Sequence, residues 1–228
     1  MNAAVGNLVI KKIGLVPYGE AWDLQKKLQR ELIDNSGQQT LIGCEHPAAI
    51  TFGNNAKSEN LLADEETLKG SGIDIYRTER GGEVTCHSPG QIVLYPIIDL
   101  NLHKRDVNWY MRSLEEVVIG TLKVYDIQGS QVPGRTGVWI VNKNPQNSLM
   151  KIASIGIRIS RWRTMHGLAL NVENCLDIFK YVNPCGYKDV IMTEMRELSK
   201  IILDKNEVMN NLIKEFCRVF KYTGKEIY

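Results

Sequence analysis

KIASIGIRISRWRTMHGLALNV, at residues 151–172, contains two β-rich runs that are separated only by Arg161. A third run, GVWIV at 137–141, precedes them. The connections between consecutive runs are too short for a crossover helix, so the three strands are expected to pair antiparallel. The middle of the chain therefore predicts a sheet with antiparallel neighbours.

Further β-rich runs and three helices are predicted around this stretch. The runs, punctuated by Gly, Pro and Asn clusters, are LIGCEH at 41–46, IDIYR at 73–77 and IVLYPII at 92–98. Periodic apolar residues predict helices over 19–35, from an N-cap at Asp106 to about Tyr125, and over 206–222. Together they predict an α+β fold, with a mixed, mostly antiparallel sheet flanked by helices, in a single domain over residues 1–228.

Charge and segment pattern limit the partners and the location. The 228 residues include 28 basic and 26 acidic side chains, a formal charge of +2, so no nucleic acid and no membrane is expected as a partner. No basic stretch precedes a long apolar run at the N-terminus, and no apolar segment reaches the ~20 residues that span a bilayer. The five cysteines show no Cys-x-x-Cys spacing and are expected to be thiols. The expected location is the cytoplasm.

The segment RGGEVTCHSPGQ, at residues 80–91, is a candidate binding loop. It packs three glycines, a histidine and a proline between two strand-like runs. Glycine lets the backbone approach a ligand closely and present N–H groups to an oxyanion. An ordinary glycine-rich turn has the same composition, so both interpretations stay open.

Lys151 occupies an unusual position in its strand. Positions 153, 155, 157 and 159 share its side by alternation and are Ala, Ile, Ile and Ile, so the lysine is expected to point toward the core. A desolvated lysine loses its proton more readily and is a candidate base. A structural ion pair, or a side chain that reaches back to solvent, would explain the pattern equally well.

His166 is expected to point inward by the same argument. It shares its side of the next strand with Trp162, Leu168, Leu170 and Val172. An inward histidine is either a core residue with satisfied hydrogen bonds or a catalytic one.

Two of the cysteines are candidate nucleophiles. Cys86 and Cys185 each lie close to a turn where a thiol can be exposed yet held in place. Cys86 adjoins His87, but neighbouring side chains on an extended chain point to opposite sides, so the pair is poorly arranged for proton transfer. Cys185 lies in Asn-Pro-Cys-Gly, where a base from another strand could meet the thiol; an inert loop thiol is the alternative.

Four motifs follow one another along the chain: RGGEVTCHSPGQ at 80–91, PGRTGVWI at 133–140, KIASIGIRISRWRTMHGLALNV at 151–172 and NPCGY at 183–187. In this order they resemble the motifs of the lipoyl(octanoyl) transferases, which belong to the wider biotin and lipoate protein ligase fold. The resemblance implies that Cys185, in the Pro-Cys-Gly motif, takes the octanoyl group as a thioester. It also implies that Lys151, in the Lys-Ile-Ala motif, activates the thiol.

The resemblance further implies an acyl pocket around the reaction centre. Its expected lining is Arg80, Gly81, Gly82, Glu83, Val84, Thr85, Cys86 and His87, then Ser154, Ile155 and Gly156, then Gly167, Leu168 and Ala169, and His166 is assigned to the same pocket. The sequence departs from the family's usual pattern at Cys86 and Ser88, where tyrosine and glycine are more typical. We therefore expect the pocket of this protein to differ from the family's usual pocket at these two positions.

The expected mechanism needs no metal, no ATP and no other nucleotide. Lys151 takes the proton of Cys185, the thiolate accepts the acyl group, and a lysine of a lipoyl domain then attacks the thioester. Backbone N–H groups near Cys185 or in the loop at 80–91 would hold the oxyanion.

The resemblance implies octanoyl-acyl carrier protein as donor. The implied acceptors are lipoyl domains of 2-oxoacid dehydrogenases and the glycine cleavage H protein, and we expect a monomer. Arg158, Arg161 and Arg163 form either a landing surface for an acidic carrier or a solvated face. An ATP-dependent lipoate or biotin ligase and a non-catalytic carrier-binding module are the alternative functions.

Overall fold

The computed structural model describes residues 5–141, 149–183 and 190–227. Its main sheet is built around β9 (Leu149–Ser160), which pairs antiparallel with β8 (Arg135–Val141) and with β10 (Arg163–Asn171). The antiparallel pairing predicted for these three strands is confirmed.

The main sheet has nine strands in the order β12-β1-β2-β6-β10-β9-β8-β7, and β11 pairs with β9. The other members are β12 (Tyr222–Ile227), β1 (Val5–Leu15), β2 (Thr40–Glu45), β6 (Gln91–Ile97), β7 (Gly129–Val132) and β11 (Ile191–Met192). β1 is parallel to both of its neighbours, and β11 is parallel to β9, whereas the remaining pairs are antiparallel. The predicted α+β class with a mixed, mostly antiparallel sheet is confirmed.

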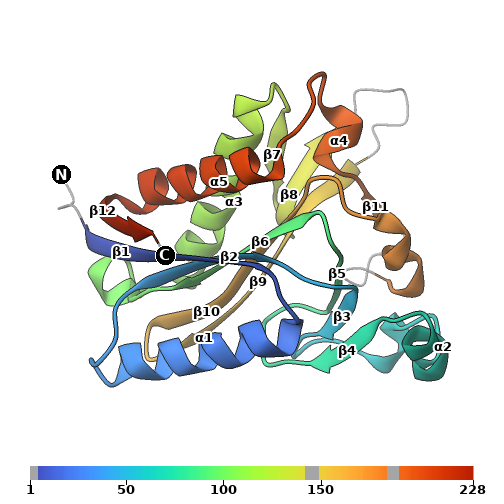
Figure 1. Ribbon diagram of the computed structural model, residues 1–228, viewed down its shortest axis with the longest axis horizontal. Helices are drawn as coiled ribbons and strands as arrows, with labels where there is room; N and C mark the ends of the chain where they lie inside the picture. The colour runs from blue at the N-terminus through green and yellow to red at the C-terminus, as the bar shows by residue number, and fades with distance from the viewer. Residues whose placement is uncertain (1–4, 142–148, 184–189, 228) are drawn as a thin grey trace.

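Helices cover both faces of this sheet (Figure 1). α1 (Tyr18–Ile33) lies on one face, and α3 (Val107–Val124) and α5 (Lys205–Phe220) lie together on the other. Asp106 caps α3 as predicted, because its side chain accepts the N–H of Trp109 at 3.0 Å. None of the described helices is long and apolar enough to cross a membrane.

The C-terminal helix is shorter than predicted. α5 ends at Phe220 because Lys221 adopts a left-handed conformation, with φ +60°, and the chain continues into β12. The N-terminal strand β1 was not predicted at all, although it is 11 residues long. β1 and β12 pair with each other from opposite ends of the chain. Because no short connection joins them, no hairpin pattern in the sequence indicates either strand.

A second, three-stranded sheet lies beside the α1 face of the main sheet, and its order is β4-β3-β5. Its strands are β3 (Ala49–Phe52), β4 (Asp74–Arg77) and β5 (Val84–His87), and α2 (Glu65–Gly70) packs against it. The short elements are η1 (Ser58–Asn60), η2 (Leu100–Leu102), η3 (Leu176–Tyr181) and α4 (Met195–Leu198). The predicted run IDIYR thus belongs to this second sheet, which carries the segment 80–91 toward the main sheet.

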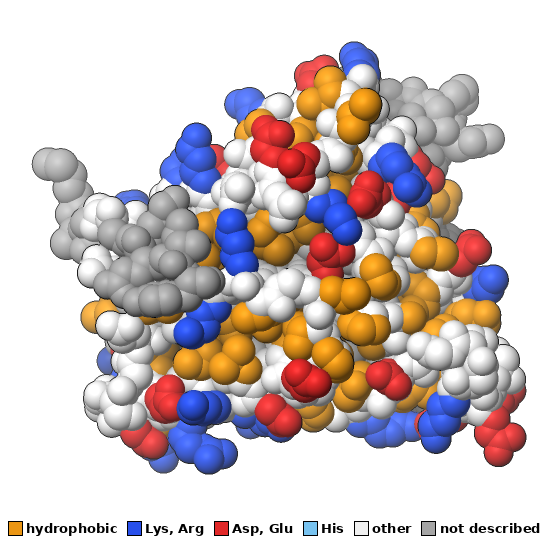
Figure 2. Space-filling view, viewed as in Figure 1, with side chains coloured by type: hydrophobic (Ala, Val, Ile, Leu, Met, Phe, Trp, Pro, Cys, Tyr) orange, Lys and Arg blue, Asp and Glu red, His pale blue; other side chains and the backbone are white. Residues whose placement is uncertain are grey.

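The two faces of the main sheet have different cores. Under α3 and α5 lies the larger core, which is made of aliphatic and aromatic side chains such as Leu94, Leu114 and Phe216. Under α1 lies a smaller core around Tyr18, Ile42 and Val93. On the face shown in Figure 2, basic and acidic side chains are interspersed rather than separated, which fits the formal charge of +2.

Candidate active site

Lys151 lies at an irregularity of the main sheet. Trp139 of β8 lies opposite Lys151, but Val138 lies opposite Ala153, so the register shifts and Ile152 is an extra residue in β9. Such a β-bulge inverts the alternation of side chains along the strand. Ile152 and Ala153 both belong to the core under α3 and α5, whereas Lys151 and Trp139 face the α1 side.

The burial predicted for Lys151 is therefore confirmed, but the predicted face is wrong. The residue is only 2% exposed, and its Nζ lies 5.3 Å from the centre of the Trp139 ring. Gly137 of β8 provides the space for this side chain. Its φ is +113°, and a Cβ built there would lie 2.7 Å from Lys151 Cε.

Arg80 organises the glycine-rich loop. Its guanidinium donates hydrogen bonds to Thr51 Oγ1 and to the carbonyl oxygens of Thr51, Gly81 and Glu83. The N–H of Gly81 donates to the carbonyl of Ile157 in β9 at 2.8 Å, which fastens the loop onto the sheet. The segment is therefore held against the main sheet by specific hydrogen bonds and is not an ordinary surface turn.

Cys86 and His87 point to opposite sides of β5, as predicted. Cys86 is fully buried in the core of the second sheet, where burial raises the pKa of its thiol, and its side chain does not line the site. Ser88, the other departure from the family pattern, is also turned away, because its hydroxyl donates to the carbonyl of Cys175 at 3.2 Å. Neither of the two unusual residues lines the cavity, so the expectation that Cys86 belongs to the pocket lining is not met.

His87 faces the site as a neutral imidazole. Its Nδ1 lies 2.7 Å from Gln91 Oε1, and the Gln91 amide donates to Cys86 O and Asn171 Oδ1. Gln91 Oε1 is therefore the acceptor, so Nδ1 of His87 carries the hydrogen and Nε2 carries the lone pair. Burial lowers the pKa of His87 well below its usual value.

His166 is buried, as predicted, but on the other face of its strand. Its φ is +59°, and this left-handed conformation turns the ring toward α1 instead of toward Leu168 and the larger core. There its Nδ1 lies 3.5 Å from Tyr18 Oη and its Nε2 lies 3.7 Å from Glu79 Oε1. Burial lowers the pKa of His166, and the nearby Glu79 opposes this shift only in part.

Tyr95 forms an end wall of the site and is hydrogen-bonded to His46, and sequence reasoning missed both residues. His46 Nδ1 lies 2.8 Å from the carbonyl of Val16 and must donate to it, so Nε2 accepts the hydroxyl hydrogen of Tyr95 at 2.7 Å. The His46 ring lies 5.4 Å from that of His87, which stacks on Tyr18 at 5.4 Å. Its position in strand LIGCEH, two residues after the buried Cys44, is a signal that could have identified it.

A cavity of about 450 Å³ is lined by Arg80, His87, Tyr95, Lys151 and His166, and it lies where β8 and β9 part. The ladder between these two strands ends at Val138 and Ala153, and beyond it both strands line the cavity. Small residues on β9 and β10, namely Ser154, Gly156, Gly167 and Ala169, make its floor. The rest of the lining includes Tyr18, Val93, Tyr95, Val107, Met111, Gly134 and Thr136.

The cavity brings together most of the residues expected in the pocket. Its lining includes Lys151 and His166, the loop residues Arg80, Gly81, Gly82, Glu83, Val84, Thr85 and His87, and the strand residues Ser154, Ile155, Gly156, Gly167, Leu168 and Ala169. Cys185, the expected nucleophile, lies outside the described residues. Among the residues that are described, no three His, Cys, Asp or Glu side chains cluster as a metal site.

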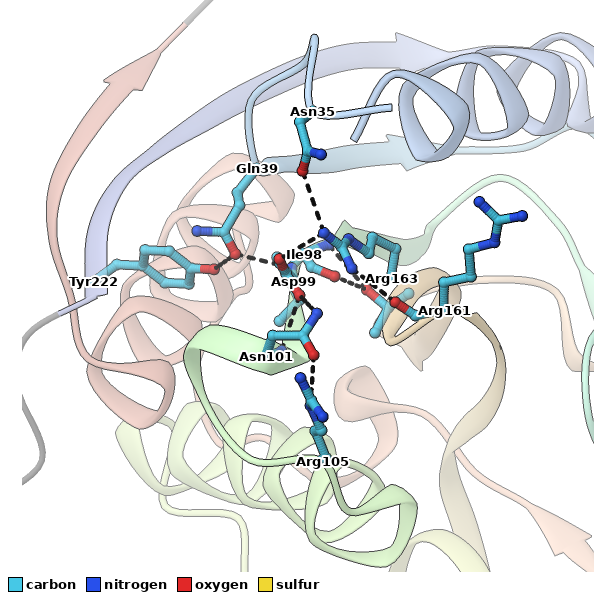
Figure 3. Close-up of polar contacts among 10 residues, drawn as sticks. Asn35, Gln39, Ile98, Asp99, Asn101, Arg105, Arg161, Arg163 and Tyr222 are labelled. Atoms are coloured by element: carbon cyan, nitrogen blue, oxygen red, sulfur yellow. Dashed lines mark hydrogen bonds and ion pairs between the residues drawn. The ribbon is translucent and has the colours of Figure 1, made fainter. Parts of the chain in front are cut away.

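The three arginines proposed as a landing surface do not act together. Arg163 forms an ion pair with Asp99 at 3.2 Å and donates to the carbonyl of Arg161, and its side chain is only 16% exposed (Figure 3). Arg161 points away from this cluster in Figure 3, and Arg158 is exposed on β9. Arg163 is therefore part of a structural network, and only the other two remain available on the surface.

Comparison with known proteins places this site in a family context. The family model "Lipoyl protein ligase A/B catalytic domain" matches residues 17–217. An octanoyltransferase of Solibacter usitatus is 39% identical over 95% of this chain and 94% of its own length. The chloroplastic octanoyltransferase LIP2p2 of Arabidopsis thaliana is 42% identical over 91% of this chain and 76% of its own length.

Solved structures agree with the fold. A bipartite lipoate protein ligase from Thermoplasma acidophilum aligns with a TM-score of 0.72 over 99% of this chain and 88% of that one, at 19% identity. A lipoate-protein ligase A bound with ATP aligns with a TM-score of 0.71 over 98% of this chain and 89% of that one, at 16% identity. At these identities the likeness concerns the fold alone.

Proposed function

Since this chain belongs to the lipoyl protein ligase A/B catalytic domain family and its activity is octanoyl transfer in protein lipoylation, we propose that it carries the octanoyl group on Cys185 as a thioester, with Lys151 as the base. The observation that carries this proposal is the position of Lys151. A β-bulge turns this buried side chain out of the apolar core and into the cavity that most of the expected pocket residues line.

In the first half of the reaction the acyl group moves onto the enzyme. Lys151 Nζ takes the thiol proton of Cys185, and the thiolate attacks the carbonyl carbon of the octanoyl thioester on the carrier. A new carbon–sulfur bond to Cys185 forms, the bond to the carrier's sulfur breaks, and the departing thiolate takes the proton back from Lys151. In this proposal the ammonium that Lys151 becomes on taking the proton stabilises the Cys185 thiolate.

In the second half the acyl group moves onto the acceptor. Deprotonated Lys151 takes a proton from the lysine amine of a lipoyl domain, and the amine attacks the thioester carbon. The amide bond forms, the bond to Cys185 breaks, and the sulfur recovers a proton from Lys151. The acyl group arrives as a thioester and is already activated, so the proposed reaction needs no ATP, and none of its steps calls for a metal.

The cavity suits an octanoyl chain. Its floor of Ser154, Gly156, Gly167 and Ala169 leaves room above β9 and β10, and Val93 and Tyr95 of β6 close the far side. Adjacent strands lie about 4.8 Å apart, so the path from β9 to β6 spans two strand spacings, which is close to the length of an extended eight-carbon acyl chain. We propose octanoyl-acyl carrier protein as the donor, lipoyl domains as the acceptors, and a cytoplasmic monomer as the working form.

Intact-protein mass spectrometry tests the proposal. The wild type, Cys185→Ala and Lys151→Ala are incubated with octanoyl-acyl carrier protein without ATP. We expect one octanoyl adduct on the wild type, none on Cys185→Ala, and much slower labelling of Lys151→Ala. Cys175→Ala, which removes an exposed thiol, is the matched control and should label as the wild type does.

Two results would overturn the proposal. An adduct that survives Cys185→Ala would place the nucleophile elsewhere. Transfer that begins only when ATP and the free acid are added would identify a ligase, as in the ATP-bound structure that shares the fold.

A further inference from the structure

Glu115 is an acidic residue that is buried beside the apolar core under α3 and α5. It lies in α3 and is only 1% exposed, among neighbours such as Leu114 and Val118 that belong to the core under the sheet. Its Oε2 accepts a hydrogen bond from Arg112 at 2.6 Å, but the Arg112 side chain is 43% exposed. Burial of a carboxylate against a core is costly, and a half-exposed partner offsets that cost only in part.

The other oxygen of Glu115 reaches the main sheet. Its Oε1 accepts the backbone N–H of Gly137 at 3.0 Å, in a buried hydrogen bond between α3 and β8. A charge-assisted bond of this kind is short and directional, so it fixes the position of one peptide unit. That peptide unit lies next to the reaction centre proposed above.

Gly137 is the residue at which the sheet opens. It immediately precedes Val138, the first residue of β8 that pairs with β9, and on the Gly137 side of that pair the two strands part around the cavity. A Cβ on Gly137 would lie 2.5 Å from the carbonyl oxygen of Ala153 and 2.7 Å from Lys151 Cε. The backbone at Gly137 is therefore in direct contact with both the bulged strand and the lysine.

We propose that Glu115 is a positioning residue for Lys151: by holding the amide of Gly137 at the point where β8 and β9 part, it keeps the lysine side chain in the cavity. This inference rests on the proposed function, because it concerns the placement of the proposed base. Glu115 touches neither the substrate nor the reacting atoms, and acts only through the backbone of β8. Sub-ångström placement of a base matters, since a displacement of about 1 Å can cost about 100-fold in rate.

Two substitutions separate positioning from simple stability. Glu115→Ala removes the acceptor for the Gly137 N–H, whereas Glu115→Gln keeps an oxygen in the same place. Glu116→Ala is the matched control, because Glu116 is the next residue of α3, is exposed, and pairs only with Arg218 among the contacts described. Each variant is assayed as the full chain for melting temperature, for kcat and KM of octanoyl transfer, and for the pH profile of the first half-reaction.

We expect kcat of Glu115→Ala to fall by about 100-fold with little change in KM, and the limb of its pH profile that reports the base to move. Glu115→Gln should recover most of kcat, and Glu116→Ala should match the wild type. The inference is overturned if Glu115→Ala keeps the wild-type kcat and pH profile, or if Glu115→Ala and Glu115→Gln lose activity equally and only in proportion to unfolding. Failure of the proposed function is recognised separately, because the wild type would then form no octanoyl adduct without ATP.

Discussion

The two faces of the main sheet are built on different principles. Under α3 and α5 the buried side chains are almost all apolar, and dense packing stabilises them. On the α1 face, β9 and β10 place Lys151 and His166 beside a cavity, and β5 of the second sheet adds His87. Buried polar groups are costly unless they are hydrogen-bonded, so the α1 face depends on specific partners such as Gln91 for His87, whereas the other face depends on close packing.

The difference arises at two irregular points of otherwise regular strands. The bulge at Ile152 turns Lys151 away from the apolar core, and the positive φ of His166 does the same one strand away. Both irregularities serve the cavity, and neither improves the packing of the core. A regular sheet with this sequence would bury a lysine and a histidine among aliphatic side chains.

Removing the buried amine of Lys151 tests the difference between the two faces most directly. Lys151→Ala should reduce octanoyl transfer by about 1000-fold, because a positioned base contributes 10²- to 10⁴-fold to a rate. Its melting temperature should change far less than the rate, because the side chain borders the cavity and is not packed into the apolar core. Single-turnover kinetics and thermal unfolding measure both, with the surface variant Lys26→Ala as control. A large loss of stability with little loss of rate would assign Lys151 to the structure instead.

Filling the space beside the lysine is the next largest perturbation. Gly137→Ala forces a Cβ to within 2.7 Å of Lys151 Cε at a φ of +113°, so we expect kcat to fall by about 100-fold. The strained backbone should also cost about 1–3 kcal/mol of unfolding free energy. Steady-state kinetics and urea denaturation report the two effects. Gly70→Ala, where a Cβ meets no atom within 4 Å, is the control; equal behaviour of both variants would contradict the argument.

A cavity on the apolar face should affect stability alone. Leu114 is fully buried in the core under α3, so Leu114→Ala should lower the unfolding free energy by about 2–5 kcal/mol. Because Leu114 does not line the site, kcat per folded molecule should stay within a few-fold of the wild type. Chemical denaturation and active-site titration at low temperature make the measurement. A changed acyl-chain preference would show that the two faces are coupled.

A substitution of Tyr95 in the end wall should have a smaller effect, on the preferred length of the acyl chain. Tyr95 closes the cavity on the β6 side and is braced by His46, so Tyr95→Leu should lengthen the space for the acyl chain. We expect the ratio of kcat/KM for decanoyl over octanoyl donors to rise by about 10-fold, the effect of one or two methylene groups. Tyr95→Phe keeps the ring and should leave the ratio nearly unchanged. If both variants shift the ratio alike, the hydrogen bond and not the wall sets the preference.

The pH dependence concerns stability and not activity. Burial lowers the pKa of all four histidines: His46, His87, His103 and His166. The unfolded chain therefore binds more protons than the folded one below its histidine pKa of about 6.5, so stability falls as the pH decreases from there. Thermal unfolding between pH 7.5 and 5 should show this decline, and His87→Gln should reduce its slope. A pH-independent melting temperature in this range would contradict the buried neutral state.

Local patterns in the sequence predicted much of the fold. Periodic apolar residues located α1, α3 and most of α5, and short connections predicted the antiparallel order of β8, β9 and β10. They did not predict β1 and β12, because these strands pair with each other from opposite ends of the chain. The end of α5 was also not predicted, because Lys221 adopts the left-handed conformation that a glycine usually adopts at this position.

Residue type and alternation within a strand were enough to predict that Lys151 and His166 are buried and that Cys86 and His87 point apart. The segments that contribute to the site were implied by the resemblance of the four motifs to a known family. Only the tertiary structure decided which face the lysine and the histidine occupy. A bulge depends on the register between two strands, and a positive φ at a histidine depends on the partners Tyr18 and Gln25 that α1 brings from far along the chain. The bond between His46 and Tyr95 and the bond from Glu115 to Gly137 likewise join residues that share no local pattern, so packing alone brings them together.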